Sequence, residues 1–233
     1  MKKKLVILSG AGMSAESGIP TFRDMGGIWE KYDIAEVASP QAWARNPQLV
    51  LDFYNQRRKK LLESLPNKGH RIIFELEKDF DVTIVTQNVD DLHERAGSSN
   101  ILHLHGELRK VRSTKHPELI YELPGWELKL GDFCEKGAQL RPHIVWFGET
   151  VDKIYDAQKI VKTADILVVV GTSLNVYPAA GLVDFAPKNT KIYVVDPTKP
   201  TLISGNKTIF ITEPASVGLE KLKELLQVGE NNA

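Results

Sequence analysis

The side chains best suited to chemistry first appear where an apolar run ends. Val82–Val85 is followed by the polar residues Gln87, Asn88 and Asp90. In open α/β sheets, ligands bind outside the carboxyl ends of the strands, which is where these side chains are expected to lie. Helix capping explains one such residue, but it does not explain all three. The segment therefore indicates a ligand site that combines amides with a carboxylate.

Two histidines follow shortly afterwards. The segment Ile101–Gly106 alternates leucines with His103 and His105. The two-residue period of a strand sends both imidazoles to one face. A histidine beside a glycine at a strand end is suited to act as a general base near neutral pH. A structural histidine is the alternative for each ring, and the sequence shows no further metal ligands beside the pair.

A glycine-rich turn follows the first apolar run, Leu5–Leu8. Residues 10–15 have the form G-x-G-x-x-A, in which backbone N–H groups can approach a phosphate closely. A tight structural turn is the alternative. No strand with an acidic residue at its end follows about 20 residues later, which disfavours the nucleotide-binding half of a dehydrogenase. Beyond the turn, Arg23 could pair with a phosphate and Phe22 could cover a ring, or both could be structural.

The elements that must position these residues alternate along the chain. Apolar, β-branched runs predict buried strands at Leu5–Leu8, Val82–Val85, Ile101–Leu104, Ile166–Val170, Ile192–Val195 and Thr208–Ile211. Helical patterns occupy Gln48–Leu65, Gly69–Lys78, Lys153–Thr163, Pro178–Phe185 and Ser216–Leu226. Such an alternation predicts the α/β class, with a Rossmann-like, doubly wound parallel sheet covered by helices on both faces.

Two regions interrupt the alternation. Residues from about 26 to 67 show only helix and loop patterns, and residues 107–140 are polar and rich in proline and glycine. We expect these insertions to form a smaller second lobe within one catalytic domain spanning residues 1–233. The large lobe would then comprise about 1–25, 68–106 and 141–233.

The composition excludes several classes of partner. Thirty basic and thirty acidic side chains balance in 233 residues, so no net charge favours nucleic acid or an anionic membrane. The apolar run after the first lysines is too short for a signal peptide, and no segment approaches the roughly 20 apolar residues of a membrane span. We therefore expect a cytoplasmic protein. Its oligomeric state cannot be deduced from the sequence.

The motifs together resemble those of one family, the sirtuins, over nearly the whole chain. The matching segments are GAGMSAESGIPTFRD, TQNVDDLHERAG, HLHGEL, LRPHIVWFGE and GTSLNVYPAAGLV, in the family's order and at its spacing. The resemblance implies that NAD is bound in an inverted, non-dehydrogenase manner. It also implies a deacylase that acts on acyl-lysine proteins. The acyl group would pass to ADP-ribose, with release of nicotinamide and free lysine.

The resemblance assigns roles to individual positions. It implies that His105 is the catalytic base, aided by Asn88 and Asp90, and that His103 is only a neighbour. The implied cofactor contacts are Gly10, Ala11, Gly12, Thr21, Phe22, Arg23, Gln87, Asn88, Asp90, Gly171, Thr172, Ser173, Asn175, Asp196 and Ala215. The implied substrate-binding strand, which would pair with the substrate backbone, is Val145, Trp146, Phe147, Gly148 and Glu149.

Tyr54 and Arg57 point to the acyl group. They are three residues apart on a predicted helix, hence on one face, and they match the Y-x-x-R signature of the sirtuins that remove succinyl and malonyl groups. A guanidinium can hold a carboxylate through two parallel hydrogen bonds. A solvated basic face is the alternative, because Arg58 and two lysines follow.

The sequence departs from the family in two places. Most sirtuins hold one zinc ion with four cysteines, but this chain has only Cys134, which with His116 falls short of a structural site. Zinc is therefore predicted to be absent. The side chains expected to hold the small lobe instead are Leu119, Ile120, Tyr121, Leu123, Trp126, Leu128, Leu130 and Phe133. At position 196 the family usually has asparagine, and Asp196 should accept NAD but repel NADP.

Two other functions fit the same motifs. One is ADP-ribosyl transfer or NAD hydrolysis, which needs no acyl pocket and would leave Tyr54 and Arg57 without a role. The other is a catalytically weak NAD-binding module, which the presence of His105, Asn88 and Asp90 disfavours.

Overall fold

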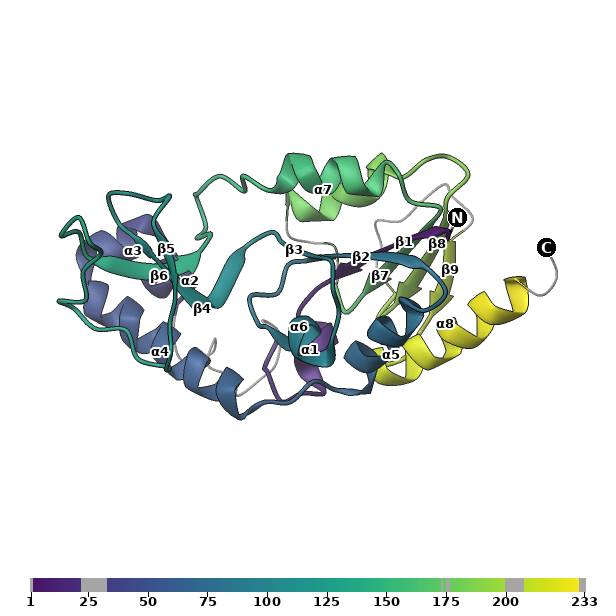
Figure 1. Cartoon of the computed structure of the whole chain (residues 1–233), viewed down its shortest axis with the longest axis horizontal. Helices are drawn as coiled ribbons and strands as arrows, with labels where there is room; N and C mark the ends of the chain where they lie inside the picture. The colour runs from purple at the N-terminus through teal and green to yellow at the C-terminus, as the bar shows by residue number, and fades with distance from the viewer. Residues whose placement is uncertain (1, 22–32, 173, 175–176, 200–207, 231–233) are drawn as a thin grey trace.

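The computed structural model describes residues 2–21, 33–172, 174, 177–199 and 208–230. Two lobes lie side by side in Figure 1, one built on a six-stranded parallel sheet and the other on a three-stranded antiparallel sheet with helices. The predicted doubly wound α/β fold with a smaller second lobe is confirmed. None of the helices in the described part of the chain has the length and apolar character that crossing a membrane requires.

The large lobe is organised by its parallel sheet, whose strands follow the order β3-β2-β1-β7-β8-β9. The strands are β1 (Lys4–Ser9), β2 (Asp81–Thr86), β3 (Ile101–His103), β7 (Ile166–Val170), β8 (Lys191–Val195) and β9 (Thr208–Ile211). The strand order reverses between β1 and β7, because the chain first builds outward from β1 to β3 and then from β7 to β9. This reversal is the position at which α/β sheets bind their ligands.

Helices cover both faces of this sheet. They are α1 (Gly12–Ala15), α5 (Lys68–Leu76), α6 (Leu92–Ala96), α7 (Ile154–Val161), the 3-10 helix η2 (Ala179–Phe185) and α8 (Ala215–Glu230). Leu5 and Ile7 of β1 belong to the apolar cluster of α5 and α8, whereas Val6 and Leu8 face α7 and η2. Both faces of β1 are therefore buried, which is why the strand is apolar throughout. The α-helix predicted over Pro178–Phe185 is instead a 3-10 helix.

The small lobe joins two segments that are far apart in the sequence. Its helices are α2 (Ile34–Val37), α3 (Pro40–Arg45) and α4 (Pro47–Glu63), and its strands are β4 (Gly106–Ser113), β5 (Ile120–Glu122) and β6 (Leu140–Ile144). The strands pair in the order β5-β4-β6, and both pairs are antiparallel. The sequence predicted no strand here. In β4, a register shift lies between Gly106 and Val111, and the buried Leu108 and Val111 are separated by the partly exposed Arg109 and Lys110.

The core of the small lobe differs from the one predicted. Leu128 is 1% exposed and packs with Leu51 and Val111, and Tyr121 and Leu123 lie against this cluster. Four of the residues expected to hold the lobe are exposed, namely Ile120, Trp126, Leu130 and Phe133. Much of the predicted packing therefore faces solvent.

The limits of the lobes remain a proposal. The antiparallel sheet fits a small lobe made of about 26–67 and 107–140, but β6 continues past the predicted limit at 140 to Ile144. We propose that residues 141–144 belong with the small lobe.

Candidate functional site

Polar side chains from three loops meet at the carboxyl ends of β1, β2 and β7. The Ser14 hydroxyl, in α1, donates to Asp90 Oδ2 at 2.9 Å and accepts from Asn88 Nδ2 at 3.0 Å. Gln87 Nε2 donates to Thr172 Oγ1 at 3.2 Å. The residues predicted at the end of β2 are therefore brought together with the first loop and with the loop after β7. Ser14 belongs to the segment GAGMSAESGIPTFRD, but neither its residue type nor its spacing indicated that it takes part in the site.

The glycine-rich turn after β1 packs tightly against the chain that leaves β7. Gly10 N donates to Val170 O at 3.0 Å, and Gly12 N donates to Gly171 O at 2.8 Å. A Cβ on Gly10 would lie 2.6 Å from Thr172 Cβ, and one on Gly12 would lie 2.7 Å from Gly171 Cα. Side chains at these positions would push the two loops apart. The glycines therefore allow a close junction at the point where the strand order reverses.

His105 is held in one tautomer. Its Nδ1 lies 3.1 Å from the Gln87 carbonyl oxygen, which can only accept, so Nδ1 carries the proton and Nε2 of the neutral ring keeps its lone pair. Burial lowers the pKa of His105, and the bond to Gln87 opposes this only in part. The ring is therefore neutral at pH 7, with a basic nitrogen. These are the properties of a general base.

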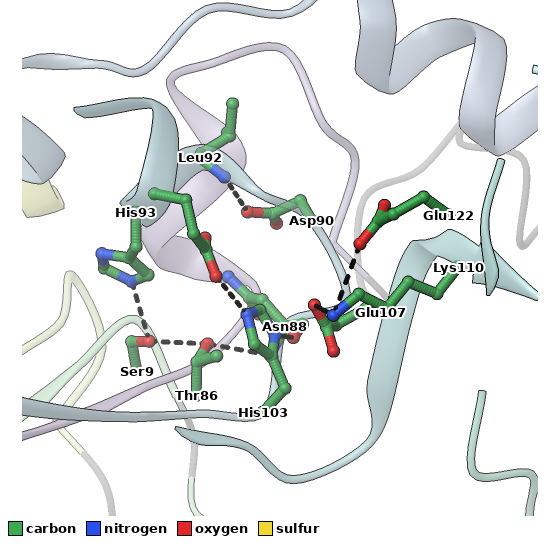
Figure 2. A network of polar contacts seen from close by, with 11 residues as sticks. Ser9, Thr86, Asn88, Asp90, Leu92, His93, His103, Glu107, Lys110 and Glu122 are labelled. Carbon is green, nitrogen blue, oxygen red and sulfur yellow. Dashed lines mark hydrogen bonds and ion pairs between the residues drawn. The ribbon is translucent and has the colours of Figure 1, made fainter. Parts of the chain in front are cut away.

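The surroundings of His103 favour a protonated ring. Its Nδ1 lies 3.1 Å from the Asn88 carbonyl oxygen and its Nε2 lies 2.7 Å from Glu94 Oε1. Burial lowers the pKa of His103, but the hydrogen bond and charge of Glu94 outweigh it, so the pKa is raised. Figure 2 shows His103 against Asn88 in this network.

The carboxyl group of Asp90 is buried within the cluster. Its Oδ1 accepts from Leu92 N at 3.2 Å, and its other oxygen accepts from Ser14. Burial raises the pKa of Asp90 above its usual value, and the hydrogen bonds from Ser14 and Leu92 and the charge of His103 oppose this shift only in part. Its neighbours thus favour the ionised form against the cost of burial.

An ion-pair network borders this cluster on the side of the small lobe. Glu94, His103 and Glu107 each offer a ligand atom within 4.8 Å of the others, a grouping that the sequence did not reveal. Lys110 Nζ lies 2.8 Å from Glu107 Oε1, and both carboxylates are therefore already paired with a cationic group. Ion pairing accounts for these residues without a metal.

Tyr54 and Arg57 of α4 approach the cluster from the small lobe. Tyr54 is 1% exposed, and burial raises its pKa to about 12 although Arg57 opposes the shift. Arg57 Cζ lies 5.8 Å from the Tyr54 ring centroid. Burial lowers the pKa of Arg57, while the charges of Tyr54 and Asp90 raise it. A phenol and a guanidinium therefore lie within electrostatic reach of Asp90.

The segment predicted to be a substrate-binding strand is a turn. β6 ends at Ile144, and Glu149 N donates to Trp146 O at 3.0 Å. The Glu149 carboxylate accepts from Arg141 Nη1 at 2.6 Å, which fixes the turn from within. Val145 N donates to His105 O at 2.9 Å. Phe147 is 50% exposed, Gly148 is also exposed, and Trp146 is buried.

Two of the other predicted cofactor residues follow strands of the parallel sheet. Asp196 directly follows β8, and its Oδ1 accepts from Thr198 N at 2.8 Å. Ala215, the first residue of α8, is buried. Thr21 is partly buried. Phe22, Arg23, Ser173 and Asn175 lie outside the described residues.

The fold and this site define a two-lobed α/β protein with a ligand site where the strand order reverses. The Sir2 family profile matches residues 10–178, and the chain belongs to this family. It is 55% identical over 230 residues to an NAD-dependent protein deacylase of Bacteroides thetaiotaomicron, covering 96% of this chain and 98% of the relative. It is also 62% identical over 197 residues to a protein of the same name from Helicobacter pylori, covering 84% of this chain and 83% of the relative.

Solved structures agree with this assignment. A Sir2 homologue mutant in complex with ADP-ribose is 38% identical, with a TM-score of 0.89 over 99% of this chain and 94% of that one. A Sir2 homologue in complex with NAD is 39% identical, with a TM-score of 0.87 over 98% of this chain and 91% of that one.

Proposed function

We propose that this chain is an NAD-dependent protein-lysine deacylase that prefers acidic acyl groups, with succinyl and malonyl ahead of acetyl. The observation that carries the proposal is the state of His105. Its ring is neutral, its Nδ1 is occupied by the Gln87 carbonyl and its Nε2 is basic. The NAD-dependent deacylases among the relatives support the reaction class.

The residues at the switch point fit NAD. The Gly10–Gly12 turn packs directly on Gly171, which fixes both loops at the position where α/β sheets bind nucleotides. Gln87, Asn88 and Asp90 add amide donors and a carboxylate acceptor that suit a carboxamide and sugar hydroxyls. When bound, NAD supplies the ribose that receives the acyl group and the nicotinamide that leaves.

Each group of the site then has a defined task. The Nε2 atom of His105 accepts a proton, and the Gln87 carbonyl keeps Nδ1–H pointing away from the reaction. Asn88 and Asp90 are immobilised through the shared Ser14 hydroxyl, so they bind without having to reorganise. We propose that the turn at 145–149 binds the substrate chain beside the exposed Phe147.

The acyl preference rests on Tyr54 and Arg57. Arg57 is a cation held in a partly buried place, where a carboxylate can repay the cost of burial. An acetyl group offers it no negative charge. Tyr54 adds a hydroxyl that stays protonated at neutral pH, because its pKa is about 12.

The test is an incubation with NAD and peptides carrying succinyl-, malonyl- or acetyl-lysine, in which free lysine and nicotinamide are both measured. Equal amounts of the two products are expected, with faster turnover of the acidic acyl groups. Nicotinamide without deacylated peptide would overturn the proposal in favour of NAD hydrolysis. His105→Ala should abolish lysine release while the circular dichroism spectrum is unchanged.

The acyl preference has its own variant. Arg57→Met should lower kcat/KM for succinyl-lysine by about tenfold or more and for acetyl-lysine much less, since only the former loses a charge-assisted bond. Arg71→Met, at an exposed position on α5, is the matched control. Equal losses on both peptides would remove the specificity claim and leave the deacylase intact. A cytoplasmic location remains a prediction from the sequence.

A further inference from the structure

Asn88 is fixed at its backbone as well as at its side chain. Its N–H donates to Thr86 Oγ1 at 3.0 Å, and its side-chain Nδ2 donates to Ser14 Oγ at 3.0 Å. Its carbonyl oxygen lies 3.1 Å from Nδ1 of His103. Figure 2 shows Thr86, Asn88 and His103 close together in this network. The histidine is the one partner of Asn88 here that titrates.

Glu94 determines what His103 can do. The Asn88 carbonyl and the Glu94 carboxylate are both acceptors, so a ring that bonds to both must carry protons on both nitrogens. A neutral ring can donate to only one of them. Glu94 therefore keeps His103 charged. Only the charged ring can donate to the Asn88 carbonyl and to the Glu94 carboxylate of α6 at the same time.

Other charged groups around His103 agree with this state. Glu107 of β4 adds a negative charge, although Lys110 pairs with it at 2.8 Å. Asp90 is also within electrostatic reach, and the charge of His103 opposes the rise that burial causes in the pKa of Asp90. His93 of α6 is also close, but burial lowers its pKa well below the usual value, so it is neutral. The net field at His103 favours the cation.

We propose that the Glu94–His103 pair is a positioning device for catalysis, in which a charged His103 holds the Asn88 carbonyl and helps keep Asp90 ionised. The inference rests on the proposed function, because it concerns the same site. It assigns opposite tasks to two histidines of one segment: His105 must be neutral to act, and His103 must be charged. Consecutive carbonyls, those of Gln87 and Asn88, are their respective partners.

The first experiment follows deacylation against pH. In the wild-type protein, activity should fall at low pH as His105 gains a proton and at high pH as His103 loses one. Glu94→Gln should move the alkaline limb to lower pH by about one unit or more, because an opposite charge at this range shifts a pKa by one to three units. The acid limb should not move. A uniform loss of activity at every pH would mark Glu94 as merely structural and overturn the proposal.

Substitutions of His103 distinguish the effect of its hydrogen bond to Asn88 from the effect of the ring itself. His103→Asn keeps an N–H near the position of Nδ1, whereas His103→Leu removes it. His103→Leu should lower kcat/KM by about tenfold, the usual range for a hydrogen bond to a charged group, and His103→Asn should recover part of that loss. Equal activity of the two variants would contradict the assigned bond.

A readout without NAD completes the test. The ring nitrogens of His103, followed by NMR in protein labelled with 15N-histidine, should titrate above the ordinary range and at lower pH in Glu94→Gln. A His103 that titrates identically in both proteins would refute the role of Glu94. The matched control is His116 and Glu118, a second His–Glu pair, 3.8 Å apart on the small lobe, where His116→Asn and Glu118→Gln should leave activity unchanged.

The two proposals fail differently. A wild-type protein without deacylase activity would refute the proposed function. An active wild-type protein whose variants keep its pH profile would refute only the positioning role.

Discussion

The two lobes are stabilised by different kinds of buried side chain. In the large lobe, apolar strands are buried between two layers of helices, and its core clusters are almost entirely aliphatic. In the small lobe, a cluster centred on Leu51, Val111 and Leu128 is accompanied by a fully buried arginine, Arg58. The small lobe thus adds to its apolar clusters a buried guanidinium that uses three of its five N–H donors, while Nη2 has no hydrogen-bond partner among the described residues.

Arg58 connects three segments of the small lobe. Its Nε donates to Leu108 O at 2.7 Å, and its Nη1 donates to Trp126 O at 2.6 Å and to Asn55 Oδ1 at 2.7 Å. Asn55 in turn exchanges two hydrogen bonds with the backbone of Leu128, at 3.0 and 2.9 Å. Burial, with the charges of Arg109 and Arg57, lowers the pKa of Arg58 to about 10, so the guanidinium stays charged at neutral and acidic pH.

The largest expected effect is the loss of this connection. Arg58→Met should lower the free energy of unfolding by about 3 kcal/mol, because it takes this donor from the Leu108 and Trp126 carbonyl oxygens and leaves Asn55 Oδ1 with only the Leu128 N–H. Urea denaturation followed by tryptophan fluorescence measures the change. Lys60→Met, at an exposed position two residues further along α4, is the control and should change stability little. An unaltered Arg58→Met protein would mean that apolar packing alone holds the lobe.

The apolar part of the small lobe gives the next largest effect. Leu128→Ala should cost about 2–3 kcal/mol, since it opens a cavity in a small cluster. Phe133, which the sequence placed in the core, is 59% exposed, and Phe133→Ala should change stability by less than about 0.5 kcal/mol. Thermal unfolding of both variants decides between the two cores, and the reverse ranking would favour the core predicted from the sequence.

Acid should weaken the protein through histidines that burial keeps neutral, which are His70 in the large lobe and His143 in β6 of the small lobe. His70 is fully buried, and burial lowers its pKa to about 4 although Glu94 opposes the shift. In the unfolded chain this histidine takes up a proton near pH 6.5, but in the folded chain it does so only near pH 4. Its contribution to the free energy of unfolding is therefore complete above pH 6.5 and is lost as the pH falls from 6.5 to 4. The loss should be roughly 3 kcal/mol, since the pKa falls by about 2.5 units at about 1.4 kcal/mol each. His70→Gln, which can still accept the bond from Asn67 N, should flatten this dependence in urea titrations. An unchanged slope would exclude His70 as its source.

The smallest expected effect concerns metal. With Cys134 as the only cysteine, prolonged treatment with EDTA should leave the melting temperature and the activity unchanged. Elemental analysis of the purified protein should find far less than one zinc per chain. A stoichiometric zinc would show that the small lobe does not depend on its packing and on Arg58 alone.

These differences between the lobes explain which elements could be predicted from the sequence and which could not. Strands such as β1 and β7 were predicted because every position is apolar and the pattern is local. The strands β4 to β6 were missed because charged residues lie between the apolar ones and prolines interrupt the segment. Arg58 stands in a run of four basic residues that favours a solvated face, and nothing local marks it as buried.

In the site, too, some residues could be predicted from local patterns and others could not. Gln87, Asn88, Asp90 and His105 could be found because they belong to contiguous motifs at strand ends. Glu94 could not be paired with His103, since α6 ends and a new strand begins between them, and only the folded chain brings them to 2.7 Å. Ser14 was hidden because a serine inside a turn is ordinarily a cap. Long-range polar contacts are the part that local patterns do not encode.

The backbone at His105 belongs to both lobes at once. Its ring is tied to the large lobe through Gln87, but its carbonyl accepts from Val145, just beyond the small sheet. Gly106 follows with φ +82, and a Cβ there would lie 2.1 Å from His143 O. No flexible spacer separates the base from the neighbouring sheet. The position of the imidazole is therefore tied to the position of the small sheet through a single peptide unit.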